Sequence, residues 1–445
     1  MSIRRRIRSW LFTVWFSPVT RTMKRRWAEW RRRLCGRAHT VHVFLELDDP
    51  YSYLLAQHLA EFRNHYAIEL RIYVTQALGD EYRPHAELLA EYSKMDCDRL
   101  ARELGLPFLD KGRAPPVEHR RALIEVLAAS ENSASFEDDV LQTLRLYWRG
   151  DAEAAARRIG SIDTRGQGAA MLQRNQDLLA RMGHYNAATL YYGGEWYWGV
   201  DRLHYLAERL DTLGLGRDQA SAVQLASIRQ ISRISLPVSP PDAARKLPAL
   251  ELFFSFRSPY AYLALQRTFE IADAFGLVLR VRPVLPMVMR GLQLPASKLL
   301  YIGSDATREA QRLQVPFGRF SDPTGVGVER CLATYAYACE EKKARDFLLR
   351  ASRAIWAEGV DVATDAGLRR VTDACGLFWP DVKAALRDDG WRRMAAENRE
   401  SMMESGCWGV PTLRLGDFTV WGQDRLWLLV RHIEEQCDTG DGILV

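Results

Sequence analysis

The run Leu250-Glu251-Leu252-Phe253-Phe254-Ser255 and the segment Ser258-Pro259-Tyr260-Ala261-Tyr262-Leu263 just after it decide the fold. The first run is short and mostly apolar, which is typical of a buried strand. In the segment, serine is a favoured N-cap and proline suits the first helical position, so a helix is predicted over residues 259–275. A second apolar strand is predicted from Leu277 to Val284. This half of the chain therefore begins as strand, helix and strand.

The rest of this half can be interpreted in the same way. A long stretch rich in Ala, Leu, Arg and Glu follows and predicts helices. Two short strands, Thr412–Leu415 and Phe418–Trp421, and a helix over Asp424–Glu435 complete the pattern. The sequence thus predicts an α/β domain with helices inserted between its second and third strands.

The first half of the chain repeats these landmarks in the same order, which indicates an internal duplication. A second strand is expected there at Ile68 to Val74. The matching pairs are Val41-His42-Val43-Phe44-Leu45-Glu46 with Leu250 to Ser255, Asp49-Pro50-Tyr51-Ser52-Tyr53-Leu54 with Ser258 to Leu263, Tyr147-Trp148-Arg149-Gly150-Asp151 with Ile355-Trp356-Ala357-Glu358-Gly359, and Trp198-Gly199-Val200-Asp201-Arg202-Leu203 with Trp421-Gly422-Gln423-Asp424-Arg425-Leu426.

This repeat predicts five parts of the chain. They are a basic N-terminal tail (1–39), a first domain (40–213), a linker (214–247), a second domain (248–437) and a short C-terminal tail (438–445). The linker contains several prolines, which is typical of a connection between domains. The two domains could pair internally, like the subunits of a dimer.

Four short motifs of the second domain, correctly spaced, carry a resemblance to a known family. They are Ser258-Pro259-Tyr260, Trp356-Ala357-Glu358-Gly359, Gly409-Val410-Pro411-Thr412 and Gly422-Gln423-Asp424-Arg425-Leu426. Together they resemble the DsbA-like thioredoxin-fold superfamily, and within it the branch of kappa-class glutathione transferases and 2-hydroxychromene-2-carboxylate isomerases. The resemblance implies two tandem thioredoxin-like domains, each with an all-helical insertion, and glutathione as a cosubstrate.

The resemblance also implies a set of site residues. Ser258 would be the catalytic residue, because the family places this hydroxyl as a donor to the sulfur of bound glutathione. Val410-Pro411 resembles a cis-proline turn whose backbone binds the cysteinyl part. Gln423 and Asp424 would hold the γ-glutamyl end, and Lys298 would supply a cationic contact. Each has a plainer alternative: Ser258 and Asp424 as helix caps, and Lys298 as a solvated helix lysine.

Magnitudes make the catalytic role of the serine plausible. A free thiol titrates near pH 8.5, and lowering its pKa by about two units takes roughly 2.7 kcal/mol. A charge-assisted hydrogen bond supplies about 1.5–3 kcal/mol. A helix N-terminus adds about 0.3–1 kcal/mol. These two contributions together are sufficient to lower the thiol pKa by about two units without a general base.

The first domain lacks the same chemistry. Asp49 stands at the position of Ser258 and caps a helix equally well, but its carboxylate would repel a thiolate. Ala187-Ala188 stands where Val410-Pro411 does in the second domain, so a trans peptide is expected. We expect the first domain to be degenerate.

Composition excludes several classes of protein. No apolar run among the 445 residues approaches the roughly 20 needed to span a bilayer. Seven scattered cysteines without a Cys-x-x-Cys pair argue against dithiol exchange and favour a reducing compartment, the cytoplasm. His58 and His65 have no further ligand at metal spacing, so no metal site is expected.

The net charge of +5 is unevenly distributed. Residues 1–40 hold twelve Lys and Arg against one acid, a charge of +11, and the other residues therefore sum to 5 − 11 = −6. The body is not expected to bind nucleic acid. For residues 1–37, three hypotheses stay open: a disordered or loosely docked tail, binding to an anionic membrane surface at the inner face of a membrane, and targeting or nucleic-acid binding.

Two functions remain. The first is a glutathione-dependent transferase or isomerase that acts on an apolar or aromatic electrophile through the second domain. The alternative is a non-catalytic tandem thioredoxin-fold binding protein at the membrane periphery.

Overall fold

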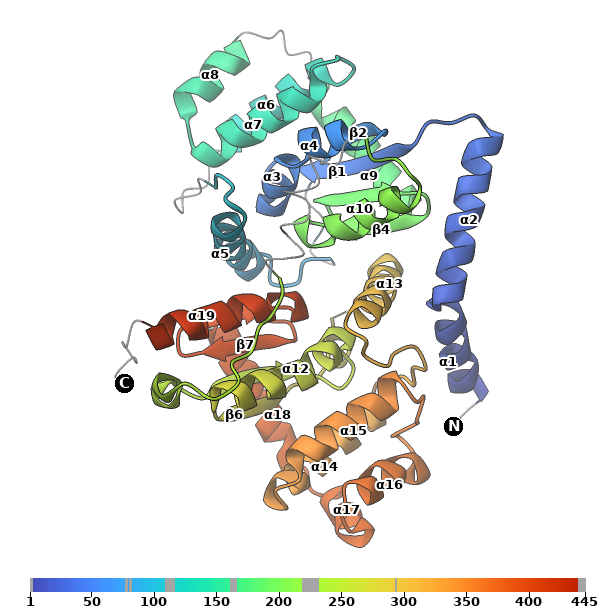
Figure 1. Ribbon diagram of the computed structural model, residues 1–445, viewed down its shortest axis with the longest axis vertical. Helices are drawn as coiled ribbons and strands as arrows, with labels where there is room; N and C mark the ends of the chain where they lie inside the picture. The colour runs from blue at the N-terminus through green and yellow to red at the C-terminus, as the bar shows by residue number, and fades with distance from the viewer. Residues whose placement is uncertain are drawn as a thin grey trace. The chain divides into compact units, whose positions relative to one another are not determined.

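The computed structural model describes residues 3–76, 79, 82–108, 117–160, 166–217, 232–292 and 294–438. The chain divides into two compact units, shown in Figure 1. The C-terminal unit comprises Met1–Thr22 with Ser232–Val445, and the N-terminal unit comprises Met23–Ile231. Part of the predicted linker (218–231) and most of the predicted C-terminal tail (439–445) lie outside the described residues.

The C-terminal unit contains a four-stranded sheet of order β6-β5-β7-β8. Strand β5 runs parallel to β6 and antiparallel to β7, and β8 is antiparallel to β7. Every residue of β5 is buried, as expected for an apolar run at the centre of a sheet. The strands are β5 (Leu250–Phe254), β6 (Leu279–Pro283), β7 (Thr412–Leu415) and β8 (Phe418–Trp421).

Helix α12 (Pro259–Phe275) connects β5 to β6, and α19 (Leu426–Asp438) follows β8. A 3-10 turn, η2 (Asp242–Lys246), packs against α19, and another, η4 (Gln423–Arg425), precedes it. Between β6 and β7 lie η3 (Met287–Arg290), α13 (Ala296–Arg312), α14 (Val326–Glu340), α15 (Ala344–Trp356), α16 (Asp365–Ala374), α17 (Trp379–Ala385) and α18 (Gly390–Glu404). Helices α14 to α17 pack on one another (Figure 1).

Most predicted boundaries in this unit agree with the structure. Helix α12 and strands β7 and β8 have the predicted ends, while β6 is shorter than the predicted Leu277 to Val284. The predicted helix start at Asp424 is wrong. Gly422 adopts a φ of 116°, the chain turns there, and residues 423–425 form a separate 3-10 turn before the helix begins at Leu426.

The N-terminal unit has the same sheet order, β2-β1-β3-β4, with β1 parallel to β2 and antiparallel to β3. Its strands are β1 (Thr40–Glu46), β2 (Glu69–Thr75), β3 (Thr189–Tyr192) and β4 (Glu195–Trp198). Its helices after β1 are α3 (Pro50–Ala56), α4 (Leu59–His65), α5 (Ala86–Leu104), α6 (Val117–Ser130), α7 (Phe136–Arg149), α8 (Ala152–Gly160), α9 (Gly168–Arg181), the turn η1 (Val200–Arg202) and α10 (Leu203–Thr212). Two short helices, α3 and α4, thus occupy the place of the single α12.

A tyrosine–aspartate pair with a buried aspartate recurs in both units. The Tyr51 hydroxyl donates to Asp96 over 2.8 Å, and the Tyr260 hydroxyl donates to Asp305 over 2.8 Å. In each pair the residues are 45 positions apart, and both aspartates are almost fully buried. Each pair ties the first turn of the helix after the central strand to a later helix.

A second hydrogen bond also recurs. The Asn175 amide donates to the carbonyl of Val74 in β2 over 3.0 Å, and the Asn398 amide donates to the carbonyl of Pro283 in β6 over 2.9 Å. Each asparagine therefore joins the last helix before the third strand to the second strand. The two units thus share sheet topology and internal polar contacts.

The N-terminal segment forms two helices, α1 (Ile3–Trp15) and α2 (Pro18–Leu34). Within the C-terminal unit, the rings of Phe12 and Phe320 lie 4.8 Å apart. The Phe16 ring lies so close to Gly303 of α13 that a Cβ there would come within 2.5 Å of it. One face of α1 is therefore packed. Of the helices that the structure describes, none has both the length and the hydropathy needed to cross a bilayer.

Candidate active site

Ser258 lies at the N-cap of α12 and has extended backbone angles. Its hydroxyl oxygen accepts the amide of Ala261 over 3.1 Å, so the predicted capping role is present. The same hydroxyl donates to the carbonyl of Val410 over 3.3 Å. The residue is half-buried. Its capping bond thus leaves the hydroxyl proton directed toward the loop before β7.

That loop contains the cis peptide bond that the sequence predicts. Among the described residues, the cis bond is Val410–Pro411. The backbone of the loop is held closely: the Thr412 hydroxyl donates to the Gly409 carbonyl over 2.7 Å, and a Cβ on Gly409 would lie 2.3 Å from the Trp421 ring. Glycine is required at this point because the indole occupies the space of a side chain.

The turn after β8 joins the same loop. The Gly422 amide donates to the Pro411 carbonyl over 2.9 Å. The Asp424 carboxylate lies over Gly422, where a Cβ would come within 2.5 Å of its oxygen, and about a quarter of the Asp424 side chain is exposed (24%). The Ser258 hydroxyl and the Gly422 amide thus connect helix α12 and the turn that carries Asp424 to the cis-proline loop.

The side chain of Gln423 is used inside the protein. It is 1% exposed, its amide donates to Glu309 over 2.7 Å, and its oxygen accepts from Arg267 over 3.1 Å. These bonds join η4 to α12 and α13. The geometry therefore gives the Gln423 side chain a positioning role and leaves only its backbone to contact a ligand.

Lys298 lies in the first turn of α13, seven residues before Asp305. At 1.5 Å per residue, this places the lysine about 10 Å along the helix from the Tyr260–Asp305 contact. Partial burial lowers the pKa of the Lys298 ammonium to about 8. Lys298 is thus a cation with restricted hydration near the start of α13.

Arg290 is a cation that the sequence analysis missed. It ends η3 and donates from Nη2 to the Trp408 carbonyl over 3.3 Å, directly before the cis-proline loop. Its Nε is buried without a hydrogen-bond partner. Burial, with a smaller effect of the Arg399 charge, lowers the pKa of Arg290 to about 10. A buried donor that lacks an acceptor is suited to bind an anion.

The Trp356 motif supports the loop that carries Ser258. The indole N–H of Trp356 donates to the Phe256 carbonyl over 3.0 Å in a buried position. The rings of Phe317 and Phe320 stack on Trp356 at 5.5 and 4.3 Å. This explains why a tryptophan far from the site in sequence is part of the motif: it sets the backbone two residues before Ser258.

A salt bridge holds the same loop from a second side. Arg257 pairs with Asp322 over 3.1 Å, and the Thr324 amide donates to the same carboxylate over 3.0 Å. Burial opposes ionisation of Asp322, but Arg257 and the Thr324 hydrogen bonds outweigh it and lower the pKa of that carboxyl.

The corresponding position in the N-terminal unit is an acid. Asp49 caps α3 by accepting the amides of Tyr51 and Ser52, and burial raises the pKa of Asp49 to about 6. At neutral pH this group is mostly an anion, which opposes a neighbouring thiolate. Among the described residues, Ala187–Ala188 is not a cis bond, as expected. The N-terminal unit thus lacks both features of the other site.

The structure places the remaining candidate residues away from this chemistry. His58 and His65 are buried, and within the described ranges no group of three or more His, Cys, Asp or Glu side chains could hold a metal ion. The seven cysteines, all among the described residues, form no disulfide bond, and Cys407 near the cis-proline loop is fully buried.

Comparison with known proteins finds a family domain in the C-terminal unit. The family model for the DSBA-like thioredoxin domain matches residues 249–434. The 2-hydroxychromene-2-carboxylate isomerase of Pseudomonas putida is 26% identical over 196 residues, which cover 42% of this chain and 95% of that protein. A solved 2-hydroxychromene-2-carboxylate isomerase is 25% identical, with a TM-score of 0.39, over 44% of this chain and 100% of its own. The solved cytosolic disulfide reductase DsbM of Pseudomonas aeruginosa is 20% identical, with a TM-score of 0.33, over 43% of this chain and 100% of its own.

Residues 249–434 are therefore a DsbA-like thioredoxin domain, and the homologues of this domain include 2-hydroxychromene-2-carboxylate isomerases. The relatives that match are 2-hydroxychromene-2-carboxylate isomerases, so the branch named from the sequence motifs fits this domain. The family match covers the C-terminal unit alone, and the duplication rests on the shared sheet order of the two units.

Proposed function

We propose that the C-terminal unit is a glutathione-dependent enzyme, an isomerase or transferase, in which the Ser258 hydroxyl stabilises the glutathione thiolate. The observation that carries the proposal is the 3.3 Å contact between the Ser258 hydroxyl and the Val410 carbonyl. It places a hydroxyl at a helix N-terminus beside a cis-proline loop, and no cysteine stands at either point. The sequence has no Cys-x-x-Cys pair, so we do not propose dithiol exchange.

The residues present suit a peptide with two carboxylates and one ammonium group. Asp424 is a partly exposed carboxylate suited to the ammonium, and Arg290 and Lys298 are cations suited to carboxylates. The backbone of Val410 and the Ser258 hydroxyl would hold the cysteinyl part. When bound, glutathione supplies a nucleophilic thiolate. The seven free cysteines suit action in a reducing compartment such as the cytoplasm.

The Ser258 proton can be redirected at small cost. Hydroxyl hydrogen bonds are usually about 2.7–2.8 Å long, so the 3.3 Å bond to Val410 is weak. A charge-assisted bond to a thiolate is stronger by about a factor of two. The hydroxyl therefore favours a sulfur anion over the carbonyl, while its oxygen still caps α12.

Two segments that we assign to the substrate side of the site meet each other. The Gly325 amide donates to the Met289 sulfur over 3.4 Å, which joins the apolar stretch after β6 to the turn before α14. Both segments carry apolar side chains, among them Val288, Met289 and Val326. We therefore propose an apolar or aromatic electrophile and make 2-hydroxychromene-2-carboxylate, the substrate named for the relatives, the first compound to test.

A second candidate is a non-catalytic binding protein. The anionic Asp49 and the missing proline at Ala188 in the N-terminal unit favour it, because they show that one copy of the fold is retained without this chemistry. Both copies would then serve a binding role.

The deciding experiment is retention of the full chain on immobilised glutathione, followed by assays of 2-hydroxychromene-2-carboxylate isomerisation and of glutathione conjugation. The proposal expects retention and glutathione-dependent turnover, with turnover lowered about tenfold to a hundredfold in Ser258→Ala but kept in the control variant Ser405→Ala. Wild-type protein that is not retained would exclude a glutathione enzyme. Retention without turnover of either kind would favour the binding protein.

A further inference from the structure

Helix α2 presents an apolar stripe to solvent. Met23, Trp27, Trp30 and Leu34 are each between 59 and 70% exposed. Their spacing of four, three and four residues puts them on one face of the helix. Large exposed apolar side chains that form one continuous stripe mark an interaction site rather than ordinary surface.

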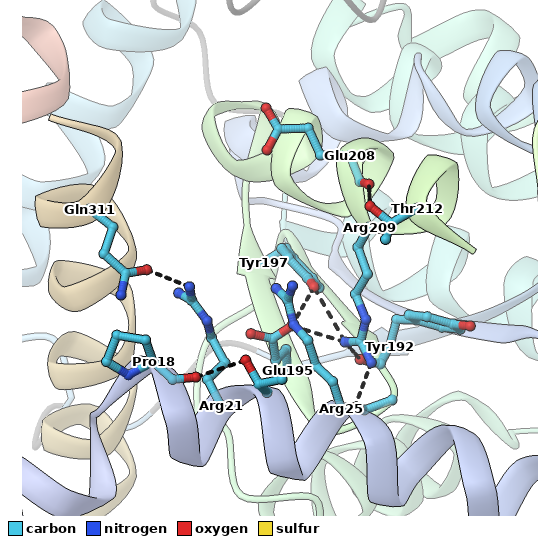
Figure 2. A network of polar contacts seen from close by, with 12 residues as sticks. Pro18, Arg21, Arg25, Tyr192, Glu195, Tyr197, Glu208, Arg209, Thr212 and Gln311 are labelled. Carbon is cyan, nitrogen blue, oxygen red and sulfur yellow. Dashed lines mark hydrogen bonds and ion pairs between the residues drawn. The ribbon is translucent and has the colours of Figure 1, made fainter. Parts of the chain in front are cut away.

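The opposite face of α2 is fixed within the N-terminal unit. Arg25 pairs with Glu195 over 2.7 Å, and the same carboxylate accepts Arg209 over 2.9 Å (Figure 2). The Arg209 side chain is 6% exposed and also donates to the Tyr192 carbonyl over 2.7 Å. This buried network sets the rotation of α2 about its axis, so the stripe faces outward because Arg25 faces inward.

Basic side chains line both edges of the stripe. A rotation of 100° per residue places Arg26 and Arg33 along one edge and Lys24 and Arg31 along the other. Lys24, Trp27 and Arg31 line a hollow of about 310 Å³ against the turn at Gly193, and the Arg31 guanidinium lies 5.5 Å from the Trp27 ring centre. The exposed face thus combines an apolar centre with cationic borders.

Helix α1 likewise has one packed face and one exposed face within the C-terminal unit. The face with Phe12 is packed on Phe320, whereas the other face is open. The exposed apolar residues of that open face, each between 43 and 63% exposed, are Ile7, Trp10, Leu11 and Val14.

We propose that these outward faces bind the surface of a bilayer containing anionic lipids, with α2 lying in the interfacial plane. Apolar side chains would enter the headgroup boundary while the arginines and the lysine contact lipid phosphates. A symmetric second copy suits this surface less well, because it would bring identical cationic borders together. Binding to nucleic acid suits the surface less well too, because it would leave the apolar side chains of Met23 and Leu34 exposed to water.

Sedimentation of the full chain with vesicles tests the proposal. Vesicles of phosphatidylcholine with one quarter phosphatidylglycerol should bind the protein at least tenfold more tightly than phosphatidylcholine alone, and high salt should weaken the binding. The pairs Trp27→Ala/Trp30→Ala and Trp10→Ala/Leu11→Ala should each lower the partition coefficient at least tenfold. Neutralising three arginines (Arg26→Gln, Arg31→Gln, Arg33→Gln) should lower it about a hundredfold, at roughly 1 kcal/mol for each charge.

Matched controls separate the stripe from general surface effects. Phe378→Ala and Arg393→Gln remove a 65% exposed ring and an 86% exposed charge from the C-terminal unit and should leave binding unchanged. Unaltered thermal melting shows that the variants fold. Equal binding of wild type and the stripe variants overturns the proposal. Stripe-dependent self-association in sedimentation velocity, or RNA binding stronger than vesicle binding, would also overturn it.

Discussion

The Ser258 hydroxyl donates to the carbonyl of Val410 over 3.3 Å while it accepts the Ala261 amide over 3.1 Å. Two segments 152 residues apart are thereby joined by one oxygen atom. The acceptor role of this oxygen stabilises the helix, and its donor role is available for chemistry. Capping and catalysis can therefore coexist in one side chain.

Removal of the hydroxyl should raise the pKa of bound glutathione. In Ser258→Ala the thiolate loses a charge-assisted bond of about 1.5–3 kcal/mol, so the thiol pKa should rise by about one to two units. The measurement is ultraviolet thiolate absorbance of the complex as a function of pH, and turnover at neutral pH should fall about tenfold to a hundredfold. Ser405→Ala is the control. An unchanged thiol pKa in Ser258→Ala would show that the serine is only a cap.

The charge of Lys298 predicts a pH dependence. With a pKa of about 8, the ammonium is mostly protonated at pH 7 and mostly neutral above pH 9. Affinity for S-methylglutathione, which has no titrating thiol, should therefore fall across this range more steeply in wild type than in Lys298→Met. Calorimetric titration measures both slopes, and the variant corrects for titration of the ligand. Parallel slopes would mean that Lys298 is a solvated helix lysine and does not contact the ligand.

The lowered pKa of Lys298 also makes the free energy of unfolding depend on pH. The pKa of Lys298 lies below its ordinary value of 10.5, so the unfolded chain binds more protons between about pH 8 and 10.5. The contribution of this lysine to the free energy of unfolding therefore rises with pH in that window. A denaturant series at several pH values should show a smaller rise in Lys298→Met.

Arg290 should contribute to glutathione affinity. Its buried Nε lacks an acceptor, and a ligand carboxylate would supply one. Arg290→Ala should weaken S-methylglutathione binding about tenfold or more, since hydrogen bonds to charged groups contribute about 1.5–3 kcal/mol. Arg393→Ala, on the exposed face of α18, is the control. If both variants bind as wild type does, Arg290 has no role in ligand binding.

Trp356→Phe should destabilise the loop before Ser258. The change removes the indole N–H and leaves the buried Phe256 carbonyl unsatisfied, at a cost of about 1–3 kcal/mol in the free energy of unfolding. Chemical denaturation measures the loss, and Trp379→Phe at the start of α17 is the comparison. A loss no larger than that of the comparison variant would mean that this hydrogen bond contributes little.

One glutathione molecule should bind per chain. The Asp49 carboxylate and the trans bond before Ala188 make the N-terminal unit unsuited to a thiolate. Isothermal titration of the full chain should therefore give a stoichiometry near one. A value near two would contradict the degenerate N-terminal unit.

The sequence alone predicted the features that depend on neighbours along the chain. The Ser258 cap, the helix over 259–275 and the strands before and after the Gly416 turn follow from local periodicity and capping, and the structure contains them. The repeat also predicted that both units have the same succession of strands along the chain, which the structure contains. The start of the last helix was missed because Gly422 and Asp424 approach each other through a local turn that propensity does not encode.

Only the tertiary structure decided which polar groups have partners. Gln423 became a buried link between helices, and Arg290 became a cation beside the cis-proline loop, because partners more than 100 residues away surround them. The exposed faces of the N-terminal helices also could not be predicted from the sequence alone. Their composition is basic and apolar throughout, and which face is left exposed depends on contacts such as those of Phe12 and Arg25 with distant segments. Local sequence patterns specify helices and strands, whereas the burial and the hydrogen-bond partners of a side chain depend on which distant segments lie beside it in the folded protein.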